Sequence, residues 1–125
     1  MQGHLKEAPP LARTAVGRDS AEMKVAAKLF DGFADPTRMS VLALLARRGE
    51  MNVSELVEAV GATQPRVSVH LRCLAWCGYV RARRKGQRVY YAIADERVLE
   101  ILRLGEAILK DNREHVEACD VTGQC

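Results

Sequence analysis

Hydrophobic residues recur at spacings of three and four along the first part of the chain, which is the period of one face of an α-helix. Three residues punctuate this pattern: Ser20 and Asp35 can cap helix N-termini, and Pro36 suits a first helical position. Gly49 and Gly61 suit the ends of helices. The pattern predicts helices over about 20–33, 36–48, from Asn52 or Ser54 to 60, and 64–76.

The hydrophobic period changes from helical to two after Gly78. Two β-rich runs, 79–83 and 88–93, flank Lys85-Gly86-Gln87, which is typical of a hairpin turn. The helical period returns from Asp95 and continues to about Leu109. Two short helices joined by a tight turn, followed by a hairpin, predict an α+β fold: a mainly helical winged helix-turn-helix with a two-stranded β-hairpin wing.

The length of 125 residues fits one domain. We expect a flexible N-terminal tail over 1–19, a winged helix-turn-helix domain over 20–111 that binds DNA and dimerises, and a C-terminal tail over 112–125 that carries cysteines. No apolar run approaches the span of a bilayer, and the N-terminus has no apolar core of a secretory signal. We therefore expect a cytoplasmic protein without a membrane partner.

Basic and polar side chains gather where such a fold reads DNA. The net charge of +3 is a weak hint, but the hairpin carries a local basic cluster without an acid. For the polar helix residues and for the basic hairpin cluster alike, the alternative is a solvated polar face. The predicted DNA-binding residues are Gln64, Arg66, Ser68, His70 and Arg72 on the helix, and Arg83, Arg84, Lys85 and Arg88 on the hairpin, with double-stranded operator DNA as partner.

The chain has four cysteines, which we expect to be reduced in the cytoplasm. Cys73 and Cys77 are four residues apart, so they share one helix face and can chelate a soft metal together. Packing is the alternative, because buried cysteine is a common small hydrophobe. An enzyme is not expected: a thiol oxidoreductase needs Cys-x-x-Cys at a helix start, and there is no phosphate loop or nucleophile–base motif.

Three motifs together resemble the ArsR/SmtB family of metal-responsive repressors: Asp35-Pro36-Thr37-Arg38, the spacing from Val67-Ser68 through His70-Leu71 to Leu74, and Gly86-Gln87-Arg88-Val89-Tyr90-Tyr91. The resemblance covers about residues 20–111. It implies a homodimer built from the first and last helices that binds an imperfect palindrome and releases DNA when metal binds.

Family sites elsewhere in the fold do not match. The arsenic-type site resembles Cys-Val-Cys where this chain has Asn52-Val53-Ser54. The zinc-type site of the last helix retains Asp95, but Arg97 and Ile108 replace its histidines.

The Cys73/Cys77 pair followed by glycine resembles the cadmium- and lead-sensing branch, and an actinobacterial mercury repressor is equally compatible. In that branch the partner subunit supplies a third thiol, for which Cys119 is the candidate and Cys125 a spare. The expected effector is thus Hg(II), Cd(II) or Pb(II), with a thiol redox-sensing repressor as the alternative and no organic cofactor.

Overall fold

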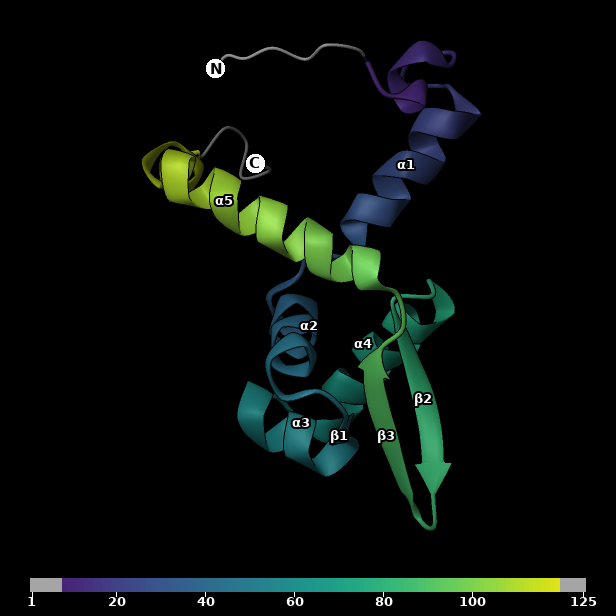
Figure 1. Cartoon of the computed structure of the whole chain (residues 1–125), viewed down its shortest axis with the longest axis vertical. Helices are drawn as coiled ribbons and strands as arrows, with labels where there is room; N and C mark the ends of the chain where they lie inside the picture. Colours follow the sequence, from purple (N-terminus) through teal and green to yellow (C-terminus); the bar gives the residue numbers. More distant parts are fainter. Residues whose placement is uncertain (1–7, 120–125) are drawn as a thin grey trace.

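The structure is a computed structural model, and it describes residues 8–119. Helices α2 to α4 and a small sheet form a compact body, while α1 and α5 project from it (Figure 1). The elements in order are the 3₁₀ turn η1 (Pro10–Arg13), α1 (Ala21–Asp31), α2 (Pro36–Arg48), β1 (Met51–Asn52), α3 (Val53–Val60), α4 (Gln64–Trp76), β2 (Val80–Lys85), β3 (Arg88–Ile93) and α5 (Glu96–Ala118).

Local side-chain caps start the helices where the sequence predicts. The Asp35 carboxylate accepts hydrogen bonds from the backbone N–H groups of Thr37 and Arg38 at 2.8 and 3.1 Å. Asn52 and Glu55 form a reciprocal capping box at the start of α3. Gly61 ends α3 with a φ of 79°, a left-handed conformation that glycine adopts without a steric penalty. These caps fix the short turn between α3 and α4, and the predicted helix-turn-helix is confirmed.

The core lies between α2, α3, α4 and the sheet. Its fully buried side chains are contributed mainly by the three helices, so α4 is held firmly by one face while its other face is open. Val98 at the start of α5 closes the top of this core. The largest fully buried side chains are Leu42, Leu45, Leu56, Leu71, Leu74, Val41 and Val67.

The sheet has three antiparallel strands in the order β1-β3-β2, one more than the predicted two-stranded hairpin. In the added strand, Met51 pairs with Tyr91 and Asn52 with Tyr90. A two-residue strand shows no alternation in the sequence, so only its pairing reveals it. The predicted hairpin is present, but Lys85 belongs to β2 instead of the turn: it pairs with Arg88, and Gly86 turns the chain with a φ of 65°.

Both predicted tails contain helical structure. Helix α5 continues to Ala118, so residues 112–118 of the predicted C-terminal tail are helical. The end of α5 is mainly polar, with Val116 as the large apolar side chain of its last turns, and this obscures the helical period. An Arg113–Glu117 ion pair at 3.2 Å supports these turns. A departure from helical backbone at Asn112 kinks α5. In the N-terminal segment, Pro10–Arg13 form a 3₁₀ turn.

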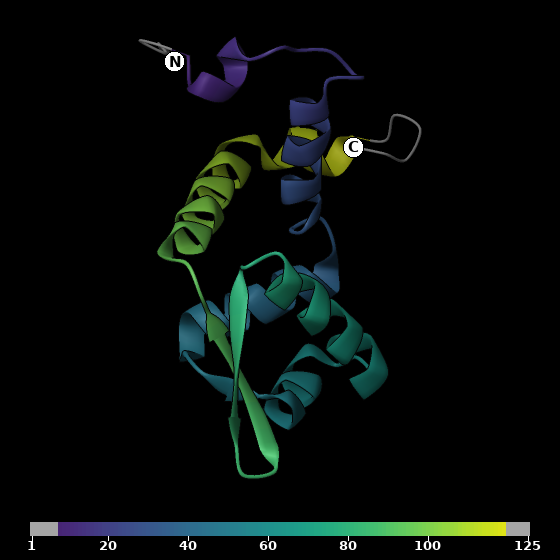
Figure 2. The ribbon, with the colours of Figure 1, turned by 90° about the vertical axis from the view of Figure 1, so that its right-hand side faces the viewer.

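Helices α1 and α5 present apolar side chains to solvent. Figure 2 shows both helices lying outside the body that contains the core. The exposed large apolar side chains of the two helices are Val25, Leu29, Phe30, Leu104, Ile108 and Val116. Over residues 8–119, no helix combines the length and hydropathy needed to cross a membrane.

Candidate nucleic-acid interface and cysteine pair

The outward face of α4 carries most of the polar side chains predicted to read DNA. Thr63 caps the helix by accepting a hydrogen bond from the N–H of Arg66 at 3.4 Å. Gln64, Arg66 and Arg72 are exposed, and Ser68 is half-buried. The opposite face is anchored in the core by valine and leucine side chains. The helix therefore presents hydrogen-bonding groups from a rigid support, as a recognition helix requires.

Two apolar residues share this outward face and escaped the sequence prediction. Val69 is 52% exposed and Trp76 is 93% exposed. Both lie on the same side as Arg72 by the helical period. A valine here suits contact with a thymine methyl group in a major groove. Placing every residue of 64–76 on a helical wheel, rather than the polar ones alone, would have revealed them.

His70 faces the N-terminus of α2 instead of the outward face. Its Nδ1 lies 3.0 Å from Nη1 of Arg38, and its Nε2 lies 3.6 Å from a carboxylate oxygen of Asp35. The side chain is only 14% exposed. The pKa of Asp35 is lowered, chiefly by the hydrogen bond from the N–H of Arg38. The structure thus separates His70 from the other residues predicted to contact bases.

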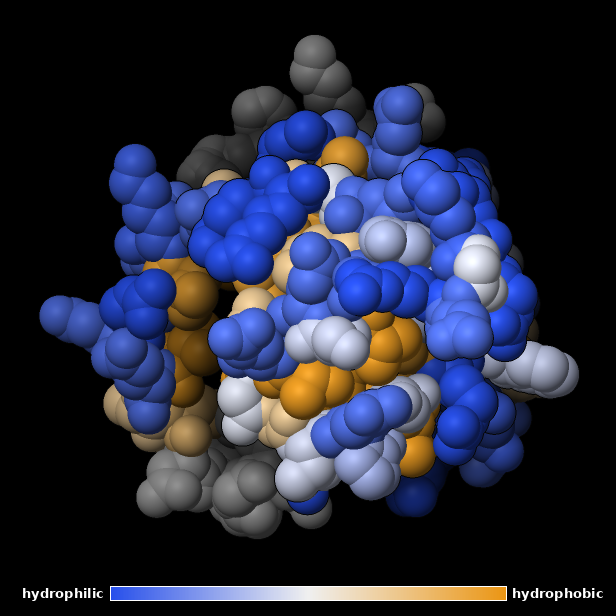
Figure 3. Space-filling view, turned by 90° about the horizontal axis from the view of Figure 1, so that it is seen from below, coloured by the Kyte–Doolittle hydropathy of each residue, from blue (hydrophilic) through white to orange (hydrophobic). Residues whose placement is uncertain are grey.

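The hairpin carries one ion-paired arginine and several exposed basic side chains. Arg83 donates to both carboxylate oxygens of Glu50, at 2.9 and 2.7 Å, and lies 5.5 Å from the ring centre of Tyr90. The hydrogen bond from Arg83 lowers the pKa of Glu50. Arg84, Lys85 and Arg88 are exposed. The underside, where α3 and the wing tip lie in Figure 1, is mainly hydrophilic, with smaller apolar areas between (Figure 3).

Cys73 and Cys77 lie together at the C-terminal end of α4. Cys73 is half-buried in the last turn, and Cys77 is the exposed C-cap, whose N–H donates to the carbonyl oxygen of Cys73 at 3.0 Å. Burial raises the pKa of the Cys77 thiol, and the neighbouring Cys73 raises it further through charge and a hydrogen bond. Arg38 and Lys28 oppose this rise. The two thiols thus lie close enough to interact with each other.

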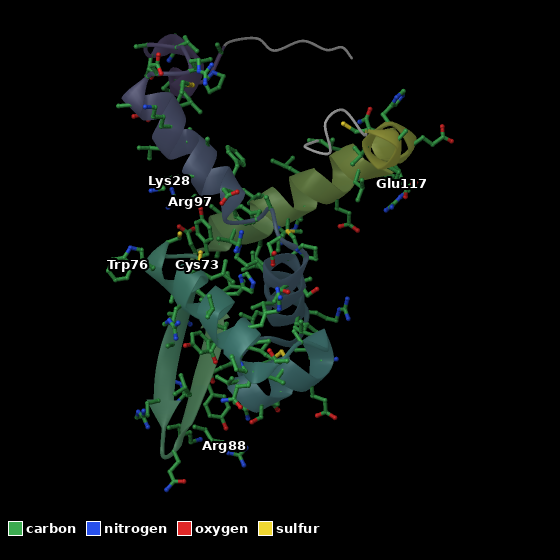
Figure 4. All side chains as sticks on the ribbon, turned by 180° about the vertical axis from the view of Figure 1, so that it is seen from behind. Lys28, Cys73, Trp76, Arg88, Arg97 and Glu117 are labelled. Atoms are coloured by element: carbon green, nitrogen blue, oxygen red, sulfur yellow. The ribbon has the colours of Figure 1, made fainter. Side chains whose placement is uncertain are left out.

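The surroundings of the cysteine pair differ on its two sides. Trp76 projects away from the ribbon, whereas Cys73 lies toward the junction of α4 with α1 and α5 (Figure 4). A pocket of about 370 Å³ adjoins Cys77 and is lined partly by Leu29 of α1 and Arg97 of α5. Among residues 8–119, no group of three or more Cys, His, Asp or Glu side chains converges as a metal cage.

Cys119 lies at the far end of α5, where it is the C-cap. Arg97, at the start of α5, lines the pocket beside Cys77. Between Arg97 and Cys119 the helix rises by roughly 33 Å at 1.5 Å per residue. Cys119 is also disulfide-bonded in the structure, contrary to the expected free thiol. The structure does not bring Cys119 to Cys73 and Cys77 of its own chain.

Comparison with known proteins decides the family. Residues 35–82 match the family described as bacterial regulatory protein, arsR family. A probable mercury resistance operon repressor of Streptomyces lividans is 44% identical over 93 residues, which are 74% of each chain. The chain belongs to the arsR family. Its relatives are DNA-binding transcriptional regulators, and the resemblance inferred from the sequence motifs is confirmed.

Solved structures give this arsR-family chain the same fold. Mycobacterium tuberculosis Rv0081 aligns with a TM-score of 0.73 and 31% identity, covering 80% of this chain and 100% of that one. A homodimeric winged helix-turn-helix DNA-binding domain from Mycobacterium bovis aligns with a TM-score of 0.67 and 33% identity, covering 81% and 93%. The predicted winged helix-turn-helix fold is confirmed.

Proposed function

We propose that this arsR-family regulator is a repressor that leaves its operator when a thiophilic metal ion binds Cys73 and Cys77. The observation that carries the proposal is the adjacency of these two thiols at the end of the helix that presents the DNA-reading side chains. Two soft sulfurs in one helical turn can bridge an ion that hard ligands would not retain. An ion bound there acts directly on α4, so binding can alter how that helix meets DNA.

Likeness to the Streptomyces lividans protein supports Hg(II) as the first ion to test, while Cd(II) and Pb(II) fit the same pair of thiolates. We propose that a third thiolate, where one is used, is Cys119 of the partner subunit after reduction. The length of α5 supports this choice, because Cys119 lies at the C-terminal end of that helix, whereas Cys77 of the same chain lies beside its N-terminal end.

We further propose that the functional unit is a homodimer on double-stranded DNA. The exposed apolar side chains of α1 and α5 support this, since an apolar surface of that extent favours association. In each subunit Gln64, Arg66, Ser68 and Arg72 would contact base edges or adjacent phosphates. The phosphates would be contacted by Arg84, Lys85 and Arg88, whereas Arg83 forms an ion pair with Glu50.

The proposal is tested by fluorescence anisotropy of the reduced protein on a labelled duplex covering the promoter of its own gene. Hg(II), Cd(II), Pb(II), Zn(II) and arsenite are each titrated in. We expect one thiophilic ion to release the DNA at a stoichiometric dose, with Zn(II) far less effective. DNA binding that no ion relieves would contradict metal sensing. Release by peroxide, without any metal response, would assign the cysteines to redox sensing instead.

The exposed basic side chains of the wing are expected to set the salt dependence of DNA binding. Replacing Lys85 or Arg88 by alanine should lower the slope of log K against log salt concentration by about 1, since each lost phosphate contact releases one fewer counterion. The loss of affinity should be similar on operator and random duplexes. Arg18→Ala, which removes an exposed cation from the segment before α1, is the matched control and should leave the slope unchanged.

A further inference from the structure

Arg38 connects three elements of the fold through one guanidinium group. Its Nε donates to the carbonyl oxygen of Gly32 at 2.9 Å, and its Nη2 donates to that of Asp31 at 2.9 Å. Its Nη1 lies 3.0 Å from Nδ1 of His70 on α4. Arg38 itself belongs to the first turn of α2. One side chain thereby links the end of α1 to the middle of the recognition helix.

The chemistry of this contact fixes the form of His70. An arginine side chain only donates hydrogen bonds, so Nδ1 of His70 must accept, and the ring proton of a neutral His70 then lies on Nε2. Nε2 faces the Asp35 carboxylate at 3.6 Å. Asp35 in turn is held by the N–H groups of Thr37 and Arg38. The imidazole is thus gripped from both sides by the N-terminal turn of α2.

Three carbonyl groups at the end of α1 accept hydrogen bonds from side chains of the body, and those of Leu29 and Asp31 also accept backbone bonds within the local turn. A helix leaves its last carbonyls without partners inside the helix. Arg38 takes those of Asp31 and Gly32, and the Tyr79 hydroxyl donates to that of Leu29 at 2.7 Å. Tyr79 also stacks on Phe33 with ring centres 4.9 Å apart. The direction in which α1 leaves the body therefore depends on Arg38 and Tyr79.

We infer that Arg38 and His70 are positioning residues that set the angle between the recognition helix α4 and helix α1, and through it the fit of the two recognition helices to DNA. This inference rests on the proposed dimer, in which α1 contributes to the interface. With α1 fixed there, a change at the Arg38–His70 contact tilts α4 relative to the subunit partner. Cys73 lies three residues beyond His70 on α4, so an ion bound at the cysteine pair would act on the same helix that the Arg38–His70 contact positions.

The test compares four variants with the wild type. His70→Leu removes the hydrogen-bond acceptor, whereas the side-chain oxygen of His70→Asn can replace Nδ1. Arg38→Lys keeps the charge but cannot bridge all three acceptors, and the fourth variant combines His70→Leu with Arg38→Lys. Affinity for the promoter duplex is measured without metal, at a temperature well below the unfolding transition of every variant. Unfolding is followed separately by circular dichroism, and binding of Hg(II) by the ultraviolet absorption of mercury–thiolate bonds.

We expect His70→Leu and Arg38→Lys each to weaken DNA binding at least about 10-fold and His70→Asn to stay within about threefold of wild type. The double variant should lose little more than Arg38→Lys alone, because that substitution already removes the contact that His70→Leu removes. The amount of Hg(II) bound at saturation, followed by the mercury–thiolate absorption, should be the same in every variant. Losses that multiply in the double variant, or wild-type affinity in His70→Leu, would overturn the inference. If metals fail to release even the wild type, the proposed function fails, yet the metal-free affinities still decide this inference.

Discussion

Cys73→Ser is expected to abolish the release of DNA by metal while leaving the affinity of the metal-free protein within about threefold of wild type. Serine keeps the size of the side chain, but its hydroxyl is a poor ligand for a soft ion, and a lone Cys77 cannot chelate. Typical coupling free energies of about 1–3 kcal/mol correspond to a 5- to 150-fold loss of DNA affinity on metal binding. That whole change should vanish in the variant, as anisotropy titrations with Hg(II) on the promoter duplex would show.

The fluorescence of Trp76 provides an independent reading of the same site. This residue is the single tryptophan of the chain and lies in sequence between the two cysteines. Metal binding should quench it in the wild type at the same stoichiometry that releases DNA.

The apparent affinity for the metal ion should fall at low pH, because the ion displaces thiol protons and burial already raises the pKa of Cys77.

Comparison with the other cysteine variants makes the result specific. Cys77→Ser should behave like Cys73→Ser, whereas Cys119→Ser should weaken metal binding only partially, since it removes a third ligand from a pair that remains. Full metal-induced release in Cys73→Ser would refute the site. An equal loss of response in all three variants would instead place three obligatory ligands around the ion.

Much of the fold follows from short-range features of the sequence. Asp35 with Pro36, Asn52 with Glu55, and Gly61 each act within a few residues, so the helix boundaries could be predicted from them. The wing was predictable for the same reason, because its strands pair across a two-residue turn. Strand β1 was not, since its two residues gain their structure only by pairing with residues about 40 positions away.

The candidate site was predictable in position more than in detail. The i, i+4 spacing of Cys73 and Cys77 on a helix is a local property, and the structure places the two thiols together as expected. His70 was assigned to DNA contact because it is polar and on the right helix. Its actual partners, Arg38 and Asp35, come from another element, and no local pattern identifies them. The disulfide state of Cys119 is likewise absent from the sequence pattern.

Ile108→Glu is expected to dissociate the proposed dimer and, as a consequence, to remove specific DNA binding. Ile108 is 61% exposed in the single chain and lines an apolar pocket of about 550 Å³. Phe33, Met39 and Leu102 contribute to the same pocket. In a two-fold dimer each substitution acts twice, so two carboxylates would enter an apolar interface without partners. We expect the dimer dissociation constant, measured by sedimentation equilibrium, to rise at least about 100-fold.

DNA binding should follow the loss of the dimer because a single subunit reaches only one half-site. An operator affinity of the monomer near that for random duplex is the expected outcome. Lys110→Gln is the matched control: it changes the net charge of the same helix by −1, as Ile108→Glu does, on an exposed polar side chain. A monomeric Ile108→Glu variant that still binds the operator like wild type would show that one subunit suffices. A variant that remains dimeric would place the interface away from this part of α5.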